Sequence, residues 1–426
     1  MPREYRKWEK LDNTANVFPV IADERTTNTY RIEVMMTETV DPKLLQQAVD
    51  LVLPRFPGFD LRMRSGIFWY YMEENGKPAP RVHEEDDYPC RLIPRNKNNN
   101  YMFRVTYYKK RINLEVFHVL ADGMGGFTFL RELCYQYLRL KHQELREKLG
   151  DGFSPETSLN REDSFKANFR RRAASTYQIK KAFLIPGERL PYQSFGVIHG
   201  HMPVDELKAA GRRLGLSINE YLVSAFVYST YRHFGRGVSQ KRPIRVAVPV
   251  NLRPYFDSIT TKNFFVMVSA EFAPDEPGMD YSFEEICQII RQSLKKQITK
   301  EHLEEIFSYN VANEDRFIAR AVPLPIKNLA IRLIYTKSAL ANTTTMTNVG
   351  NITILKEYQP YIRMFHGFIP FSKGQEIKVT IMSYNGTLAC SITSAFVDTS
   401  IPRDFFRQIA ADGVSVQIET NGVFSK

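Results

Sequence analysis

The sequence predicts an α/β protein with mixed sheets, built as two lobes of similar construction. Strand patterns and helix patterns alternate along most of the 426 residues, and both halves contain them in comparable proportions. Between about 150 and 195 the periodicity weakens and proline, serine and glycine accumulate. Since domains average roughly 150 residues, we expect more than one core, with an N-terminal lobe at 1–180 and a C-terminal lobe at 190–426.

The first half opens with a strand pattern, YRIEVMM, from Tyr30. A helix is expected to begin at Asp41-Pro42, because aspartate caps helices and proline fits the first turn. The segments at 59–64 and 67–72 predict two further strands, and the aromatic run FWYY in the second predicts burial on both faces. The segments at 101–108 and 112–120 predict a hairpin, followed by a helix after Gly126 with one apolar stripe.

The second half repeats the alternation. It predicts a strand at 195–202 and a helix at 204–214, and Ser217 with Glu220 forms a capping box for another helix. Strands are expected at 244–250 and 264–272, then a helix around Phe283 and a helical region at 301–340. Strands at 343–354 and 361–369, a hairpin turning at Asn385-Gly386 and a helix near Pro402 complete the chain.

Composition excludes several classes of protein. With 43% hydrophobic and 12% aromatic residues, the chain is expected to fold fully. The net charge of +11 is spread among acidic residues, so we expect no nucleic-acid partner, although a phosphate-bearing small molecule would be attracted. The charged start MPREYRKWEK and the lack of long apolar runs predict a cytoplasmic protein without a membrane span.

The four cysteines stand far apart without a CxxC pair, which argues against zinc and redox motifs, and we expect them to be reduced and buried. His199 and His201 have metal-like spacing, but the sequence suggests no third ligand, so a structural role is favoured and no metal site is predicted. Nucleophile motifs such as G-x-S-x-G are absent.

The segment His118-Val-Leu-Ala-Asp122-Gly123 is the sharpest chemical signal in the sequence. A histidine ends a hydrophobic strand here, and a neutral imidazole accepts a proton from an alcohol or amine near neutral pH. Gly123, Gly125 and Gly126 keep the following turn free of side chains, but they do not make the G-x-G-x-x-G of a dinucleotide site. On these residues alone, a core histidine before a turn explains the segment as well as catalysis does.

HVLADG resembles the HxxxDG signature of the superfamily that contains chloramphenicol acetyltransferase, nonribosomal-peptide condensation domains, plant BAHD acyltransferases and bacterial alcohol acetyltransferases. Two further segments are similar to the condensation-like branch. In PVNLRP, the resemblance implies that Arg253 pairs with Asp122 across the lobes, and in TNVG it makes Thr347 or Asn348 a candidate donor to an oxyanion. The DFGWG of the plant enzymes is absent, which favours a protein similar to bacterial alcohol acetyltransferases.

The resemblance implies two chloramphenicol-acetyltransferase-like lobes with a channel between them. It implies an acyltransferase that moves an acyl group, such as acetyl, from acyl-CoA to an alcohol or amine, with His118 as general base and catalytic support from Asp122 and Gly123. Acyl-CoA would be a co-substrate, and no permanent cofactor is expected. Two alternatives stay open: a donor held on an acyl carrier protein, and a homologue that binds thioesters or partner proteins without turnover. A monomer is expected, because two lobes in one chain already supply the interface between them.

Overall fold

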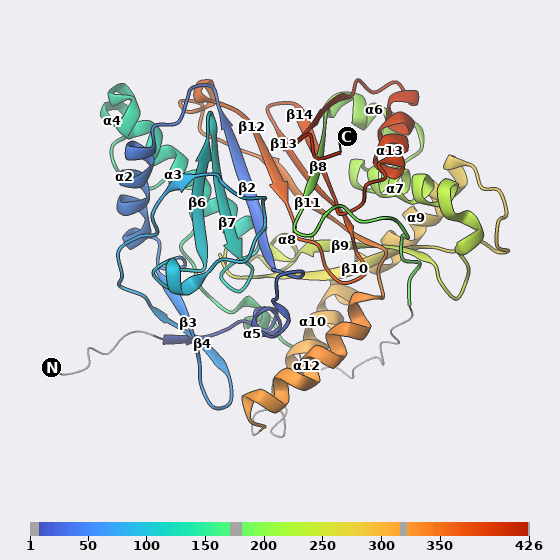
Figure 1. Cartoon of the computed structure of the whole chain (residues 1–426), viewed down its shortest axis with the longest axis horizontal. Helices are drawn as coiled ribbons and strands as arrows, with labels where there is room; N and C mark the ends of the chain where they lie inside the picture. Colours follow the sequence, from blue (N-terminus) through green and yellow to red (C-terminus); the bar gives the residue numbers. More distant parts are fainter. Residues whose placement is uncertain (1–7, 171–180, 316–321, 425–426) are drawn as a thin grey trace.

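Two large sheets form the two lobes and lie side by side in the computed structural model, which describes residues 8–170, 181–315 and 322–424 (Figure 1). The N-terminal sheet has five strands in the order β12-β2-β7-β6-β5. The C-terminal sheet has seven in the order β10-β9-β11-β13-β14-β8-β15, and a small sheet has the order β1-β4-β3. The predicted fold class, mixed α/β in two lobes, is confirmed.

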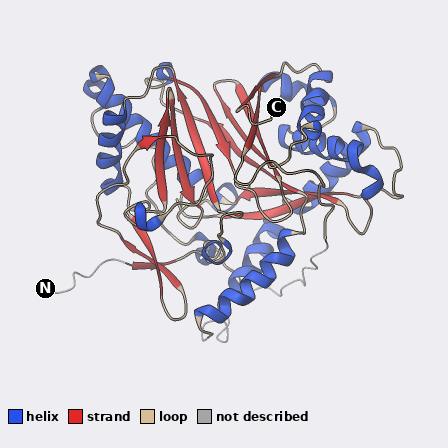
Figure 2. Ribbon diagram, viewed as in Figure 1, coloured by secondary structure: helices blue, strands red, loops and turns tan. Residues whose placement is uncertain are grey.

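The strands of the first half are short and mostly antiparallel. Their bounds are β1 Trp8–Lys10, β2 Thr29–Met36, β3 Leu61–Ser65, β4 Tyr70–Glu74, β5 His83–Glu84, β6 Phe103–Tyr108 and β7 Arg111–Phe117. The helices of this half are α1 Phe18–Ile21, α2 Pro42–Val52, α3 Gly123–Lys141, α4 Gln143–Leu149 and α5 Ser164–Ala167. Helix α3 packs on α2 and on β2 and β7, so the apolar stripe predicted after Gly126 covers one face of the sheet (Figure 2).

The second half has longer strands and more helices. The strands are β8 Gly196–Pro203, β9 Ile244–Asn251, β10 Phe265–Phe272, β11 Thr344–Ile352, β12 Ile362–Phe368, β13 Ile377–Tyr384, β14 Thr387–Ser394 and β15 Gln417–Thr420. The helices are α6 Val204–Arg213, α7 Ile218–Phe234, α8 Arg253–Phe256, α9 Phe283–Gln297, α10 Lys300–Asp315, α12 Leu324–Ala339 and α13 Ser400–Ala411. Helices α6, α7, α9 and α13 cover the C-terminal sheet (Figure 2).

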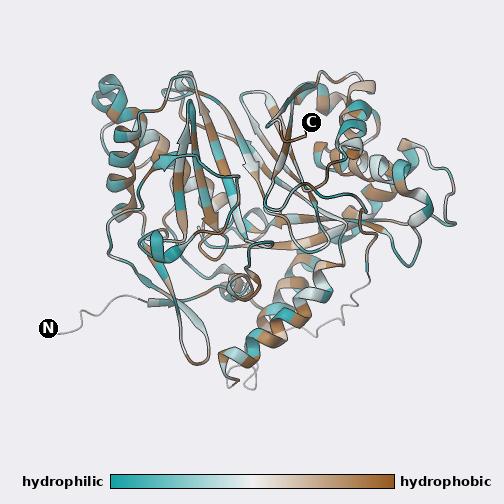
Figure 3. Cartoon of the chain, viewed as in Figure 1, coloured by the Kyte–Doolittle hydropathy of each residue, from teal (hydrophilic) through white to brown (hydrophobic). Residues whose placement is uncertain are grey.

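Each lobe encloses its own apolar core, and hydrophobic residues run along the strands of both large sheets (Figure 3). The local predictions from capping and turns are confirmed: Asp41 caps α2, Ser217 and Glu220 form a capping box, and the turn at Asn385-Gly386 has positive φ angles at both residues. The four cysteines are free and buried. No helix in the described part of the chain is long and apolar enough to cross a membrane.

The aromatic run at 68–71 was expected in a strand buried on both faces, and that expectation is wrong. Strand β4 begins only at Tyr70, and the side chains of Ile67 and Trp69 are 74% and 41% exposed. The physical reason is that β4 belongs to the three-stranded sheet at the edge of the molecule, which is not sandwiched between helices.

Strand β12 belongs by sequence to the second half but pairs antiparallel with β2 of the first, with Phe365 opposite Val34. It therefore forms one edge of the N-terminal sheet, where it contacts strands β13 and β14 of the C-terminal sheet (Figure 1). The exchange joins the two lobes by a continuous piece of backbone, so the junction is fixed by main-chain hydrogen bonds as well as by side chains.

Candidate active site

His118 follows the last residue of β7, and its backbone N–H donates a 2.8 Å hydrogen bond to the carbonyl of Asn28. The imidazole is half-buried among aromatic rings. It stacks on Phe18 of α1 with the ring centroids 4.5 Å apart, and Tyr30 and Phe265 approach at 5.1 and 5.7 Å. Phe265 begins β10, so the ring lies where residues of both lobes meet.

The side chain of Asn263 determines which nitrogen of His118 carries the proton. Its amide nitrogen donates to the His118 carbonyl at 3.2 Å and to Asp12 Oδ2 at 3.0 Å, which leaves Oδ1 facing His118 Nδ1 at 2.9 Å. A carbonyl oxygen can only accept, so the amide cannot be turned around and Oδ1 must receive a hydrogen from Nδ1. The neutral ring therefore holds its lone pair on Nε2, the nitrogen that a general base uses.

Burial sets the charge of this group. Desolvation lowers the pKa of His118 below its ordinary value of 6.5, although the charge of Asp122 and the hydrogen bond with Asn263 oppose the shift. Burial also raises the pKa of Asp12 to about 7, against the hydrogen bond from Asn263. The imidazole is therefore unprotonated at neutral pH, and a second titratable group lies behind it through one amide.

Asp122 does not contact His118 by any of its side-chain hydrogen bonds; it fixes the loop that follows. It is the N-cap of α3, and its two oxygens receive four donors. Oδ1 accepts from the Gly125 N–H at 3.0 Å and from Arg253 Nη2 at 3.0 Å, and Oδ2 accepts from Arg253 Nη1 at 2.8 Å and from the Phe264 N–H at 3.1 Å. The geometry thus makes Asp122 an organiser of the loop rather than the third member of a triad.

Arg253 comes from α8 in the other lobe and uses its remaining donors on residues near it in the chain. It donates from Nε to the carbonyl of Thr260 at 2.9 Å and from Nη2 to that of Lys262 at 2.7 Å. Its Nη1 also donates to Asn251 Oδ1 at 3.2 Å. The side chains of Asp122 and Arg253 are 8% and 13% exposed, so the pair is largely shielded from water. The structure therefore brings Asp122 and Arg253 together across the lobes as a bidentate pair.

Two of the loop glycines are required by close approach. A Cβ on Gly125 would overlap with the carbonyl oxygen of Thr261, and a Cβ on Gly126 would overlap with the hydroxyl of Tyr30. That hydroxyl is itself fixed, because it donates to the carbonyl of Asp122 at 2.7 Å. Gly123 differs from them: around it a Cβ would meet only a methyl of Val349, at 4.0 Å, so its neighbourhood is open.

Thr347 and Asn348 lie on β11, and the contact of Val349 with Gly123 places this stretch beside the His118 loop. Thr347 is half-buried, whereas Asn348 is exposed and its Oδ1 accepts from the Gly350 N–H at 2.9 Å. The pairing of β11 with β13 shifts register between Asn348 and Gly350, so the strand bulges at Val349. The bond at Oδ1 leaves the Nδ2 donor of Asn348 unused, so the two candidate oxyanion donors differ in burial, and Thr347 is the less exposed.

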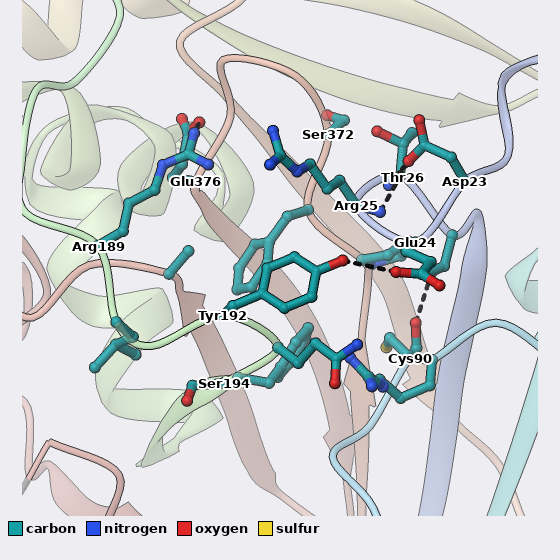
Figure 4. A pocket seen from close by; sticks show the side chains of 18 of the residues that line it. Asp23, Glu24, Arg25, Thr26, Cys90, Arg189, Tyr192, Ser194, Ser372 and Glu376 are labelled. Carbon is teal, nitrogen blue, oxygen red and sulfur yellow. Dashed lines mark hydrogen bonds and ion pairs between the residues drawn. The ribbon is translucent and has the colours of Figure 1, made fainter.

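Two cavities of about 560 and 540 Å³ lie where segments of both halves meet, and the wall of neither includes His118. The larger, drawn in Figure 4, lies between Tyr192 of the second half, which donates to Glu24 of the first at 2.7 Å, and the segment around Thr27. The lining of this cavity includes Thr27, the residue before Asn28, and the carbonyl of Asn28 accepts the hydrogen bond from the backbone N–H of His118. The cavity thus approaches the strand end that carries the imidazole.

Sequence reasoning missed four residues that shape this site: Asp12, Phe18, Tyr30 and Asn263. An asparagine just before a strand is typical of any turn, so nothing marks Asn263 in TTKNFF. The only usable signal is that TTKNFF follows PVNLRP closely, since a short return to an antiparallel strand keeps the two segments together.

No protein-family model matches the sequence, and no curated protein matches it. Several solved structures, however, have a similar fold. Polyketide synthase associated protein 5 from Mycobacterium tuberculosis superposes with a TM-score of 0.62 and 15% identity, over 95% of this chain and 97% of that one. TRI101 from F. sporotrichioides, complexed with coenzyme A and T-2, gives 0.62 and 13% over 95% and 97%. The starter condensation domain of rhizomide synthetase RzmA, in complex with C8-CoA, gives 0.57 and 12% over 99% and 97%. The chain therefore has the two-lobed fold of condensation domains and of the acyltransferases similar to them, as the HxxxDG resemblance implied.

Proposed function

We propose that this protein transfers an acyl group from a coenzyme A thioester to a hydroxyl or amine, with His118 as general base. The observation that carries the proposal is the fixed tautomer of His118. Asn263 holds Nδ1–H, so the lone pair lies on Nε2, and the lowered pKa of His118 keeps it available at neutral pH.

In the proposed reaction, Nε2 of His118 removes the proton from the acceptor, and the oxygen or nitrogen attacks the carbonyl carbon of the thioester. The negative charge that develops on the carbonyl oxygen is stabilised by donors near the bulge of β11, with Thr347 preferred over Asn348. The carbon–sulfur bond then breaks, and the departing thiolate receives the proton from His118. Asp122 and Arg253 act before any of these steps, by fixing the loop and the lobe junction.

The acyl donor could be delivered in two ways, as a free thioester or attached to a carrier protein, and solved structures with this fold offer examples relevant to each. TRI101 and the RzmA starter domain were solved with coenzyme A or an acyl-CoA. Other structures with this fold are the first condensation domain of the calcium-dependent antibiotic synthetase and part of the nonribosomal peptide synthetase FmoA3, which favours a second candidate, a donor attached to a carrier protein. The net charge of +11 favours a free donor with several phosphates, because positive potential concentrates anions near the surface.

The test is a direct assay of thiol release. Purified protein is mixed with acyl-CoA donors from acetyl upward and a panel of alcohols and amines, and separately with the same acyl groups on a carrier protein. We expect acceptor-dependent release of coenzyme A, and we expect His118→Ala to lower turnover by about 10²- to 10⁴-fold, as for loss of a general base.

The matched control is His302→Ala, which removes a half-buried imidazole of α10 whose side chain is 41% exposed. It should leave the rate unchanged. Undiminished acyl transfer by a folded His118→Ala protein would end the assignment of His118, and release from carrier-bound donors alone would favour the condensation-like alternative.

A further inference from the structure

A cluster of three histidines and one glutamate lies where the two large sheets meet. His199 and His201 stand on β8 and His366 on β12, directly opposite Glu33 of β2. The ring of His366 lies 4.2 Å from that of His199 and 5.2 Å from that of His201, measured between centroids. The sequence suggested no third partner for His199 and His201, and the exchanged strand β12 supplies one.

His366 has the arrangement of a metal-binding histidine. Its Nδ1 lies 3.1 Å from Glu33 Oε1, and its Nε2 lies 2.9 Å from Nε2 of His201. Nδ1 of His366 and an oxygen of Glu33 are close enough to bind one metal ion together, and Nε2 of His366 is then left to share a hydrogen bond with His201. Histidine ligands commonly use their other ring nitrogen in this way to hold the ring in place.

The imidazole of His199 is suited to the same role. Its Nδ1 lies 2.9 Å from the hydroxyl of Ser391, which leaves Nε2 as its ligand atom. One ligand atom each from Glu33, His199 and His366 lies within 4.8 Å of the other two.

A buried oxygen of Glu33 independently indicates that a cation binds here. Glu33 is 1% exposed, and its Oε2 has no hydrogen-bond partner, although its Oε1 contacts His366. A buried carboxylate oxygen without a partner is costly, and a bound cation would satisfy it. Arg111, the nearest guanidinium, reaches only Oε1, at 3.9 Å.

The cluster is also accessible and electrostatically suitable. The cavity of about 540 Å³ is lined by Glu33, His199 and His366, and its wall carries five carboxylates against the two guanidinium groups of Arg31 and Arg111. Carboxylates thus outnumber guanidinium groups on this wall, which favours cations over anions.

We propose that Glu33, His199 and His366 form a binding site for a divalent transition metal, with Zn²⁺ as the preferred ion, and that His201 holds the ring of His366 in place. Imidazole and carboxylate ligands suit Zn²⁺, whereas Mg²⁺ and Ca²⁺ prefer oxygen alone. The ion joins β8 of the C-terminal sheet to β2 and β12 of the N-terminal sheet and so clamps the lobes together. Glu33 lies four residues along β2 from Thr29, which pairs with Phe117 beside His118, and at roughly 3.3 Å per residue this is about 13 Å away. The site is thus separate from the acyl-transfer centre.

The test uses the full chain without an affinity tag, treated with EDTA and dialysed. Titration with ZnCl₂ in a calorimeter should show about one equivalent bound, and Co²⁺ added in place of Zn²⁺ should give the visible absorption of a site with nitrogen ligands. His366→Gln and Glu33→Gln should each abolish this binding, because each removes a ligand. His201→Asn should weaken it by about 10- to 100-fold, as expected for a residue that orients a histidine ligand. In parallel, saturating Zn²⁺ should raise the thermal midpoint of the native protein but not that of His366→Gln.

His302→Asn, which alters a half-buried histidine on α10 outside the cluster, is the control and should bind like the native chain. If His366→Gln fails to fold, His201→Asn replaces it, because that ring is half-exposed at the edge of the cluster. The proposal is overturned if the native protein binds well under one equivalent, or if His201→Asn and Glu33→Gln bind Zn²⁺ as tightly as His302→Asn does.

Discussion

Replacing Asp122 by asparagine tests whether this residue joins the two lobes. Each oxygen of Asp122 accepts from two donors, one of them always a guanidinium nitrogen of Arg253. An amide has only one accepting oxygen, so in either orientation its NH₂ group faces two donors and both of those hydrogen bonds are lost. A neutral hydrogen bond is worth about 1 kcal/mol and one to a charged group about 2 kcal/mol, so Asp122→Asn should cost about 3 kcal/mol of unfolding free energy.

The assay is urea unfolding followed by tryptophan fluorescence, which reports on Trp8 and Trp69, the only tryptophans in the chain. Asp151→Asn is the matched control: Asp151 also binds an arginine, Arg146, through two hydrogen bonds at 2.9 and 3.0 Å, but both side chains are more than half exposed. Surface ion pairs contribute little, so this variant should unfold almost as the native protein does.

A double-mutant cycle isolates the pair itself. Arg253→Met should also destabilise the protein, and the double variant should cost about 1 to 3 kcal/mol less than the sum of the single changes, because the second substitution removes a partner that is already lost. Strict additivity, or an Asp122→Asn protein no less stable than Asp151→Asn, would refute the role of the pair at the lobe junction.

Three further predictions concern the His118 loop. Asn263→Leu should lower kcat/KM about tenfold, because the lost hydrogen bond is worth about 1 kcal/mol and no longer fixes the tautomer of His118. Asn263→Asp still accepts from Nδ1–H and should retain more activity, so equal losses in both variants would count against the tautomer argument. Burial lowers the pKa of His118, so the acid limb of a profile of kcat/KM against pH should be centred below pH 6.5. An acid limb centred above pH 6.5 would contradict an unprotonated base. Gly126→Ala should lower the free energy of unfolding in urea by about 1 to 3 kcal/mol, because its Cβ overlaps the Tyr30 hydroxyl. Gly123→Ala has open space around it and should not destabilise the fold, so similar costs for both variants would place the strain elsewhere.

Local features of this fold could be read from the sequence because they depend on neighbouring residues. Asp41 and Ser217 cap helices through contacts within three residues, and Asn385-Gly386 turns a hairpin through its own φ angles. The aromatic run around Trp69 failed because hydrophobic character alone does not tell a strand between two layers from a strand in a small sheet at the edge.

Long-range features could not be read in the same way. The pairing of Glu33 with His366 depends on the register of two strands more than 300 residues apart, which no local pattern encodes. The pairing of Asp122 with Arg253 was expected only because HVLADG and PVNLRP resemble a known family, and spacing along the chain would not have suggested it. Asn263 had neither a pattern nor a resemblance to mark it.

Among the described residues, the hydrogen bonds and the ring contact of His118 and Asp122 with the other lobe come from one segment, which runs from Asn251 to Phe265. It supplies the guanidinium on Asp122, the amide on His118 Nδ1, the backbone N–H of Phe264 and an aromatic ring against the imidazole. The position and tautomer of the imidazole therefore depend on the lobe junction, although His118 itself belongs to the N-terminal lobe. If His118 is the base, as we propose, a change that displaces this segment should alter the rate even when it touches no substrate, because the segment holds both the ring and the loop that follows it.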